Sequence, residues 1–130
     1  MAEISTGKPP HYDIEYDEEL AIQICNGLRP EFAKNTPECY IKLANKCMDA
    51  DSSNRSTASV IYYELNKWHS IVNNCTAKDK DELAILKAFQ SADVVIPKLS
   101  TELSICPKDK LTTSKSIEFS DIPTVMMMSR

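Results

Sequence analysis

Residues 36–48 read Thr-Pro-Glu-Cys-Tyr-Ile-Lys-Leu-Ala-Asn-Lys-Cys-Met, and this stretch decides the fold class. Its apolar side chains recur at the spacing that places them on one face of a helix, and they are Tyr40, Leu43, Ala44, Cys47 and Met48. Thr36 is predicted to cap this helix and Pro37 to fill its first position, where a proline loses no hydrogen bond. The stretch therefore predicts an amphipathic helix.

Helical patterns also lie on both sides of this stretch. Residues 17–25 begin with three acidic residues, which favour a helix N-terminus, and the pattern stops at Asn26-Gly27. Thr57 is expected to cap a third helix, and its inward face is predicted to hold Ile61, Leu65, Trp68 and Val72. A polar loop over residues 49–56 separates it from the second helix.

A fourth helix is predicted over about residues 79–96. Either Asp79 or Thr76 is the cap, and Pro97 is the stop. The residues predicted to point inward are Leu83, Leu86, Phe89 and either Val94 or Val95. No strand-like alternation occurs before residue 98, so the fold is predicted to be all-α, with a largely disordered tail over residues 98–130.

The amino-terminal residues and the overall composition limit the structures, partners and cellular locations that are expected for this chain. Residues 1–6 are expected to form a helical turn ended by Gly7. The net charge of -4 argues against nucleic acid as a partner, because such binding draws on clustered Lys and Arg. No basic leader precedes an apolar run, and no apolar stretch approaches the roughly 20 residues that span a bilayer. A cytoplasmic or nuclear location is expected, without membrane attachment.

Several kinds of chemistry are disfavoured by the residues themselves. The chain holds two glycines, Gly7 and Gly27, and neither lies in a phosphate-cradling loop. The loop that starts at Asp49 lacks the glutamate that a calcium loop needs at its twelfth position. Cys39 and Cys47 share a helical face but are separated by roughly 12 Å, too far to hold one zinc ion. No cofactor and no metal is therefore expected in this chain.

Ordered motifs in the chain resemble the carboxy-terminal lobe of the protein-kinase catalytic domain. Residues 1–10, with Glu3-Ile4 and Gly7, resemble the end of the central lobe helix. Gly27, Arg29 and Pro30 resemble the G-x-R-P turn that follows the next helix, and Arg55 resembles the arginine of a motif that usually ends in arginine-proline. The resemblance is strongest with the tyrosine-kinase-like group of fungal serine/threonine kinases.

The resemblance implies a division of the chain and a loss of activity. Residues 1–72 would be a truncated, partial kinase lobe, residues 73–97 an additional helix, and residues 98–130 the tail. The family's ATP- and magnesium-binding motifs precede Met1 in the family order, so this chain is expected to have no catalytic residue and no enzyme activity. Arg55 would lack its buried glutamate partner, and Ser53 and Ser56 stand where the family usually has prolines.

Two alternatives to an inactive kinase fragment remain open at this point. The chain is a helical interaction module if the helix over residues 17–25 binds a substrate or regulator of kinases, with Asp17, Leu20 and Ile24 as candidate docking residues. It is part of an active kinase if the gene model is incomplete. Self-association through exposed apolar faces is also expected if the helices lack their family neighbours.

Overall fold

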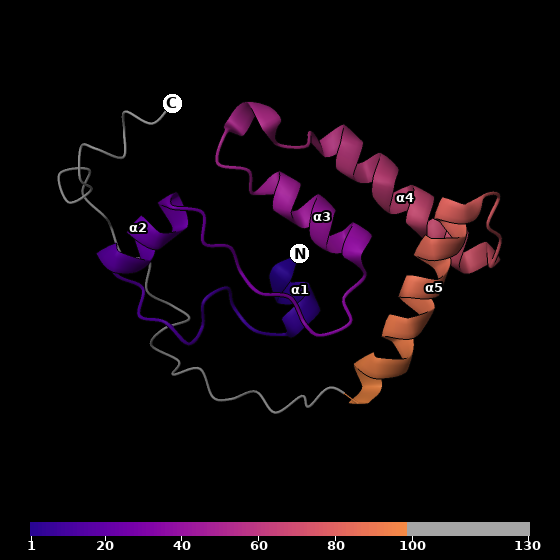
Figure 1. Cartoon of the computed structure of the whole chain (residues 1–130), viewed down its shortest axis with the longest axis horizontal. Coiled ribbons are helices and arrows are strands. Elements are labelled where there is room, and N and C mark those ends of the chain that lie inside the picture. The colour runs from indigo at the N-terminus through magenta and orange to yellow at the C-terminus, as the bar shows by residue number, and fades with distance from the viewer. Residues whose placement is uncertain (99–130) are drawn as a thin grey trace. The chain divides into compact units, whose positions relative to one another are not determined.

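The computed structural model describes residues 1–98, and this range is helical without a strand (Figure 1). The elements are α1 (Ala2–Thr6), α2 (Glu18–Cys25), α3 (Glu38–Cys47), the 3-10 turn η1 (Ser52–Asn54), α4 (Ala58–Asn74), α5 (Lys80–Val95) and the 3-10 turn η2 (Ile96–Lys98). The prediction of an all-α fold is confirmed. The predicted disordered tail lies, from residue 99 onward, outside the described residues. Within residues 1–98, no helix has both the length and the apolar character needed to cross a membrane.

The described residues group into two compact units. One consists of residues 2–31 and contains α1 and α2, and the other consists of Met1 with residues 32–98 and contains the remaining elements. The boundary expected at residue 72 falls inside α4, which continues to Asn74. The larger unit carries the packed core, and the smaller one carries the turn that contains Gly27, Arg29 and Pro30.

The start of α3 differs from its predicted cap. Pro37 is the N-cap residue and the helix begins at Glu38, one residue later than predicted. The hydroxyl of Thr36 donates to the carbonyl oxygen of Ala33 at 2.7 Å, so it serves the preceding turn and not the helix. The prediction of a Thr36 cap was therefore wrong, because the helix begins one residue later and Pro37, whose side chain has no acceptor, occupies the N-cap position.

The starts of α4 and α5 agree with the sequence. The Thr57 hydroxyl accepts the N–H of Val60 at 3.4 Å, as predicted. Asp79, and not Thr76, caps α5, because its carboxylate accepts the N–H groups of Asp81 at 2.9 Å and Glu82 at 2.8 Å. Between these helices Cys75 turns the chain in the left-handed region, with φ of 47°.

The core of the larger unit lies where α3, α4 and α5 meet. In Figure 1, α5 runs across the carboxy-terminal part of α4. The buried side chains of this unit come from all three helices, and the hydrophobic ones are Leu43, Ala44, Trp68, Ile71, Leu86 and Ala92. Burial of Leu43, Ala44, Trp68 and Leu86 confirms part of the predicted inward faces.

Three predicted inward positions are exposed instead. Leu65 is 42% exposed, Leu83 41% and Val94 62%, whereas Ile71 and Ala92, which the patterns did not single out, are buried. A sequence pattern shows which residues share a face of a helix, but the neighbouring helix decides which edge of that face is covered. The crossing of α4 and α5 therefore shifts burial toward Ile71 and Ala92.

Candidate functional site

Arg55 forms a hydrogen bond within the loop that connects α3 and α4. Its Nε donates to the carbonyl oxygen of Asp49 at 2.8 Å, and its side chain is exposed. The same loop is tightened by Asp51, whose carboxylate accepts the N–H of Ser53 at 2.8 Å and its hydroxyl at 2.7 Å. Within the described residues, the partner of Arg55 is thus a carbonyl of its own loop and not a carboxylate.

Ser56, next to Arg55, has an unusual environment for a serine. Its hydroxyl oxygen is buried and has no hydrogen-bond partner among the described residues. Leaving such a group unpaired costs about 1–3 kcal/mol. Arg55 has φ of -67° and ψ of 141°, the extended conformation that the residue before a proline prefers. Arg55 therefore has the backbone conformation that a proline at position 56 would require of the residue before it.

The Gly27–Pro30 turn ends α2 through a backbone hydrogen-bond motif and a side-chain hydrogen bond. The N–H of Leu28 donates to the carbonyl oxygen of Gln23 at 2.9 Å and that of Gly27 to Ile24 at 3.1 Å, which together form a Schellman motif. Gly27 has φ of 105°, a value that residues with a side chain rarely adopt. The Nη1 of Arg29 adds a bond to the same Ile24 oxygen at 2.9 Å, which places a cation at the negative end of the helix.

The three candidate docking residues on α2 differ in what they offer a partner. Asp17 is the N-cap, and its carboxylate accepts the N–H of Leu20 at 3.0 Å. Leu20 itself is 6% exposed, whereas Ile24 is 40% exposed. Ile24 is therefore the apolar side chain of this set that a partner could reach without unfolding the helix.

A row of aromatic rings runs through the larger unit. Ring centroids lie 6.4 Å apart between Phe32 and Tyr40, 6.5 Å between Tyr40 and Trp68, and 5.9 Å between Trp68 and Phe89. A shallow groove of about 220 Å³ lies along this row, and Leu65 and Val72 complete its apolar lining. The row joins α3, α4 and α5, so its main effect is to hold the three helices together.

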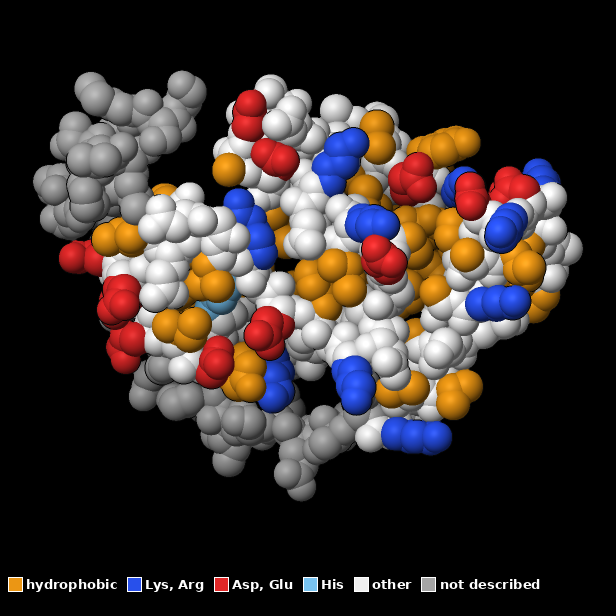
Figure 2. Space-filling view, viewed as in Figure 1, with side chains coloured by type: hydrophobic (Ala, Val, Ile, Leu, Met, Phe, Trp, Pro, Cys, Tyr) orange, Lys and Arg blue, Asp and Glu red, His pale blue; other side chains and the backbone are white. Residues whose placement is uncertain are grey.

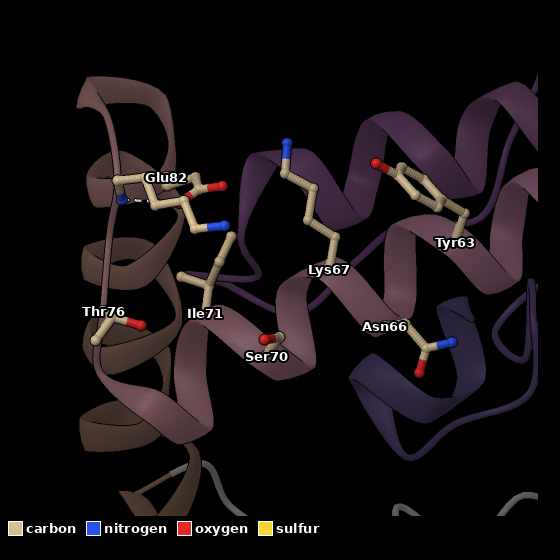
Figure 3. A pocket seen from close by; sticks show the side chains of 8 residues that line it. Tyr63, Asn66, Lys67, Ser70, Ile71, Thr76 and Glu82 are labelled. Carbon is tan, nitrogen blue, oxygen red and sulfur yellow. Dashed lines mark hydrogen bonds between the residues drawn. The ribbon is translucent and has the colours of Figure 1, made fainter.

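A second, polar hollow of about 320 Å³ lies between α4 and the start of α5 (Figure 3). Tyr63, Lys67 and Ile71 are spaced four residues apart along α4 and therefore share one face of it. The α4–α5 connection contributes Thr76 and Lys78. The remaining lining residues are Asn66, Ser70 and Glu82. Sequence reasoning missed this hollow, because no motif links the residues of a helix with those of the loop that follows it.

Charges elsewhere on the described surface are mixed. Figure 2 shows Lys and Arg side chains interspersed with Asp and Glu on the face that it draws. Among residues 1–98, no group of three or more His, Cys, Asp or Glu side chains is placed to hold a metal ion.

Burial raises the pKa of the Cys39 thiol, which keeps this half-buried residue protonated and unreactive near neutral pH.

Comparison with families of known proteins, with curated proteins and with solved structures found no match. The kinase resemblance therefore rests on the motifs themselves, namely the Gly27–Pro30 turn, the Arg55 loop and their order along the chain.

Proposed function

We propose that residues 1–74 form the carboxy-terminal helices of a protein-kinase-like lobe, and that this chain acts by binding another protein and not by transferring phosphate. The observation that carries the proposal is the order of the parts. A short helix ended by Gly7 precedes α2, the Gly27–Pro30 turn follows α2, and the Arg55 loop separates α3 from α4. This is the order that the family resemblance predicts.

Phosphoryl transfer needs a nucleotide, a metal and an acceptor held in line, and the motifs that hold them in kinases are not present in the 130 residues. The purified chain, incubated with ATP, magnesium and a basic acceptor protein, is expected to transfer no phosphate and to bind no fluorescent ATP analogue. An intact serine/threonine kinase provides the positive control. Robust nucleotide binding or phosphotransfer would overturn this part of the proposal.

The same motifs also suit a longer, active kinase that includes these residues. The adjoining upstream nucleotide sequence decides between the two readings. An in-frame catalytic loop and activation segment would favour an active enzyme, whereas stop codons would favour a separate, non-catalytic protein.

The partner surface that we propose is the exposed side of α2 around Ile24. Its apolar side chain is 40% exposed and stands on a helix capped at both ends, so it is presented on a defined backbone. Ile24→Asp is expected to abolish capture of a kinase substrate or regulator in a pull-down, with Gln23→Asp, an exposed neighbour, as the control. Leu20→Asp is unsuitable for this test, because Leu20 is buried and the change would unfold the helix.

Self-association is a competing use of exposed apolar side chains. Tyr62 is 72% exposed, Tyr63 68% and Ile96 58%. Sedimentation equilibrium over a range of protein concentrations distinguishes the two uses, since a monomer at micromolar concentration would argue against self-association.

A further inference from the structure

We propose that the polar hollow between α4 and the start of α5 binds a small phosphate monoester. This proposal goes beyond the proposed protein-binding function and concerns a different part of the chain. The hollow lies wholly within the larger unit, and its volume of about 320 Å³ is at the lower end of the range of small-molecule sites.

The charge of the lining is the first argument. The whole chain carries a net charge of -4, yet this hollow is lined by two lysines, Lys67 and Lys78, and by one carboxylate, Glu82. Neither lysine has an ion-pair partner among the described residues. The Glu82 carboxylate is already engaged, because its Oε2 accepts the backbone N–H of Lys78 at 2.8 Å beside the positive end of α5. The site therefore presents two uncommitted cations.

The neutral polar groups are the second argument. Tyr63, Ser70 and Thr76 line the same hollow, and the hydroxyl of each is a potential hydrogen-bond donor to an oxyanion. Figure 3 shows Tyr63 and Lys67 projecting from α4 on one side, while Ser70 and Thr76 lie toward its carboxy-terminal end and the following loop. The donors thus come from one helix and from the connection that leaves it.

The match of charge and donors favours phosphate over carboxylate. A carboxylate carries one charge and two acceptor oxygens, whereas a phosphate monoester carries a charge of about -1.5 to -2 and three strong acceptor oxygens. Two ammonium groups and three hydroxyls match the larger charge and the three acceptor oxygens of a phosphate monoester. The ring of Tyr63, which is 68% exposed, adds apolar surface for a small organic group on the ester.

Binding is tested on the full chain by NMR titration with inorganic phosphate, phenyl phosphate and acetate at low ionic strength. Phenyl phosphate is expected to bind most tightly and acetate most weakly, with shifts confined to the amides of residues 63–71 and 76–82. Lys67→Gln and Lys78→Gln are each expected to weaken phenyl phosphate binding about 3- to 10-fold, the range for an exposed charge-assisted hydrogen bond. Lys67→Arg, which keeps the charge, is expected to retain most of the affinity.

Lys87→Gln is the matched control, because Lys87 is an exposed lysine on α5 that does not line the hollow. An equal loss of affinity in this variant would overturn the proposal and indicate diffuse attraction by the surface. Three other results would also overturn the proposal. They are shifts spread over the whole chain, acetate binding as tight as phosphate binding, and the absence of any shift at about 20 mM phosphate. That concentration is on the order of ten times a millimolar dissociation constant. Thermal unfolding of each variant, followed by circular dichroism, verifies that the helices are intact.

Discussion

The indole of Trp68 on α4 and the ring of Phe89 on α5 lie with their centroids 5.9 Å apart and their planes inclined at 46°. Trp68 is 6% exposed, and Phe89 is half-buried. This pair links α4 and α5, the two longest helices within residues 1–98. The contact makes the packing of α5 against α4 testable with the chain's single tryptophan as the reporter.

Phe89→Ala is expected to lower the free energy of unfolding by about 2–3 kcal/mol, somewhat less than full burial would imply, because the ring is half-buried. Tryptophan emission is expected to shift to longer wavelength as water reaches Trp68. Leu83→Ala on the same helix is the control, since Leu83 is 41% exposed. A comparable loss in both variants would show that Leu83 is as important for packing as the sequence pattern predicts.

Asp79→Ala is expected to cost about 1 kcal/mol, because it removes the acceptor for two N–H groups at the start of α5. Thr76→Ala removes the rival cap of the sequence prediction and is expected to leave stability unchanged. Urea denaturation measures both effects. The opposite order of the two variants would contradict the cap that the structure assigns.

Ser56→Pro is expected to raise stability by about 0.5–1 kcal/mol, since it restricts the unfolded chain and removes a buried, unpaired hydroxyl. Ser53→Pro is the control within the same loop and is expected to be destabilising, because the Ser53 N–H donates to Asp51 and a proline has none. Thermal unfolding compares the two. Destabilisation by both variants would mean that the backbone at position 56 does not suit proline.

Arg55→Ala is expected to cost about 0.5–1 kcal/mol, the contribution of one exposed hydrogen bond to the Asp49 carbonyl. Arg55→Lys keeps the charge but lacks the Nε donor, and it is expected to cost as much. A loss of several kcal/mol in the alanine variant would instead indicate a buried carboxylate partner of the kind that the kinase family implies.

The pair of Glu38 and Lys42, whose Nζ and Oε1 atoms lie 2.8 Å apart, predicts a dependence on pH. The hydrogen bond from Lys42 lowers the pKa of Glu38 from its usual value, so the unfolded chain takes up a proton first as the pH falls. The small stabilisation by this exposed pair is present above the carboxyl pKa of the unfolded chain and is lost as the pH falls through the lower, folded-state pKa. NMR titration of the Glu38 carboxyl carbon measures the shift, and Lys42→Gln is expected to remove it.

The sequence predicted the helices well, because their start and stop signals are local. Thr57 and Asp79 cap the helices that follow them through their own side chains, as predicted, and α2 ends at Cys25, directly before the Asn26-Gly27 stop that the sequence predicts. Thr36 does not cap α3 because the helix begins one residue later than predicted and Pro37 takes the N-cap position. A sequence pattern does not determine the first residue of a helix to within one position.

The identity of the buried side chains and the position of the hollow were less predictable, because both depend on how the helices cross. Leu65 and Ile71 both lie on α4, and the choice of the buried one follows from the position of α5. The hollow around Lys67 and Lys78 arises from the same crossing. Ile24 and Leu20 were proposed together for docking, yet only their surroundings in the fold distinguish an accessible side chain from a buried one.

Trp68 is in ring contact with Tyr40 on α3 and with Phe89 on α5 at the same time. Any change of volume at position 68 therefore disturbs two helix interfaces together, and the effects of substitutions at the three positions will not add. Positions 40, 68 and 89 therefore form one volume-coupled set, in which a loss of volume at one position is expected to be offset by a gain of volume at another.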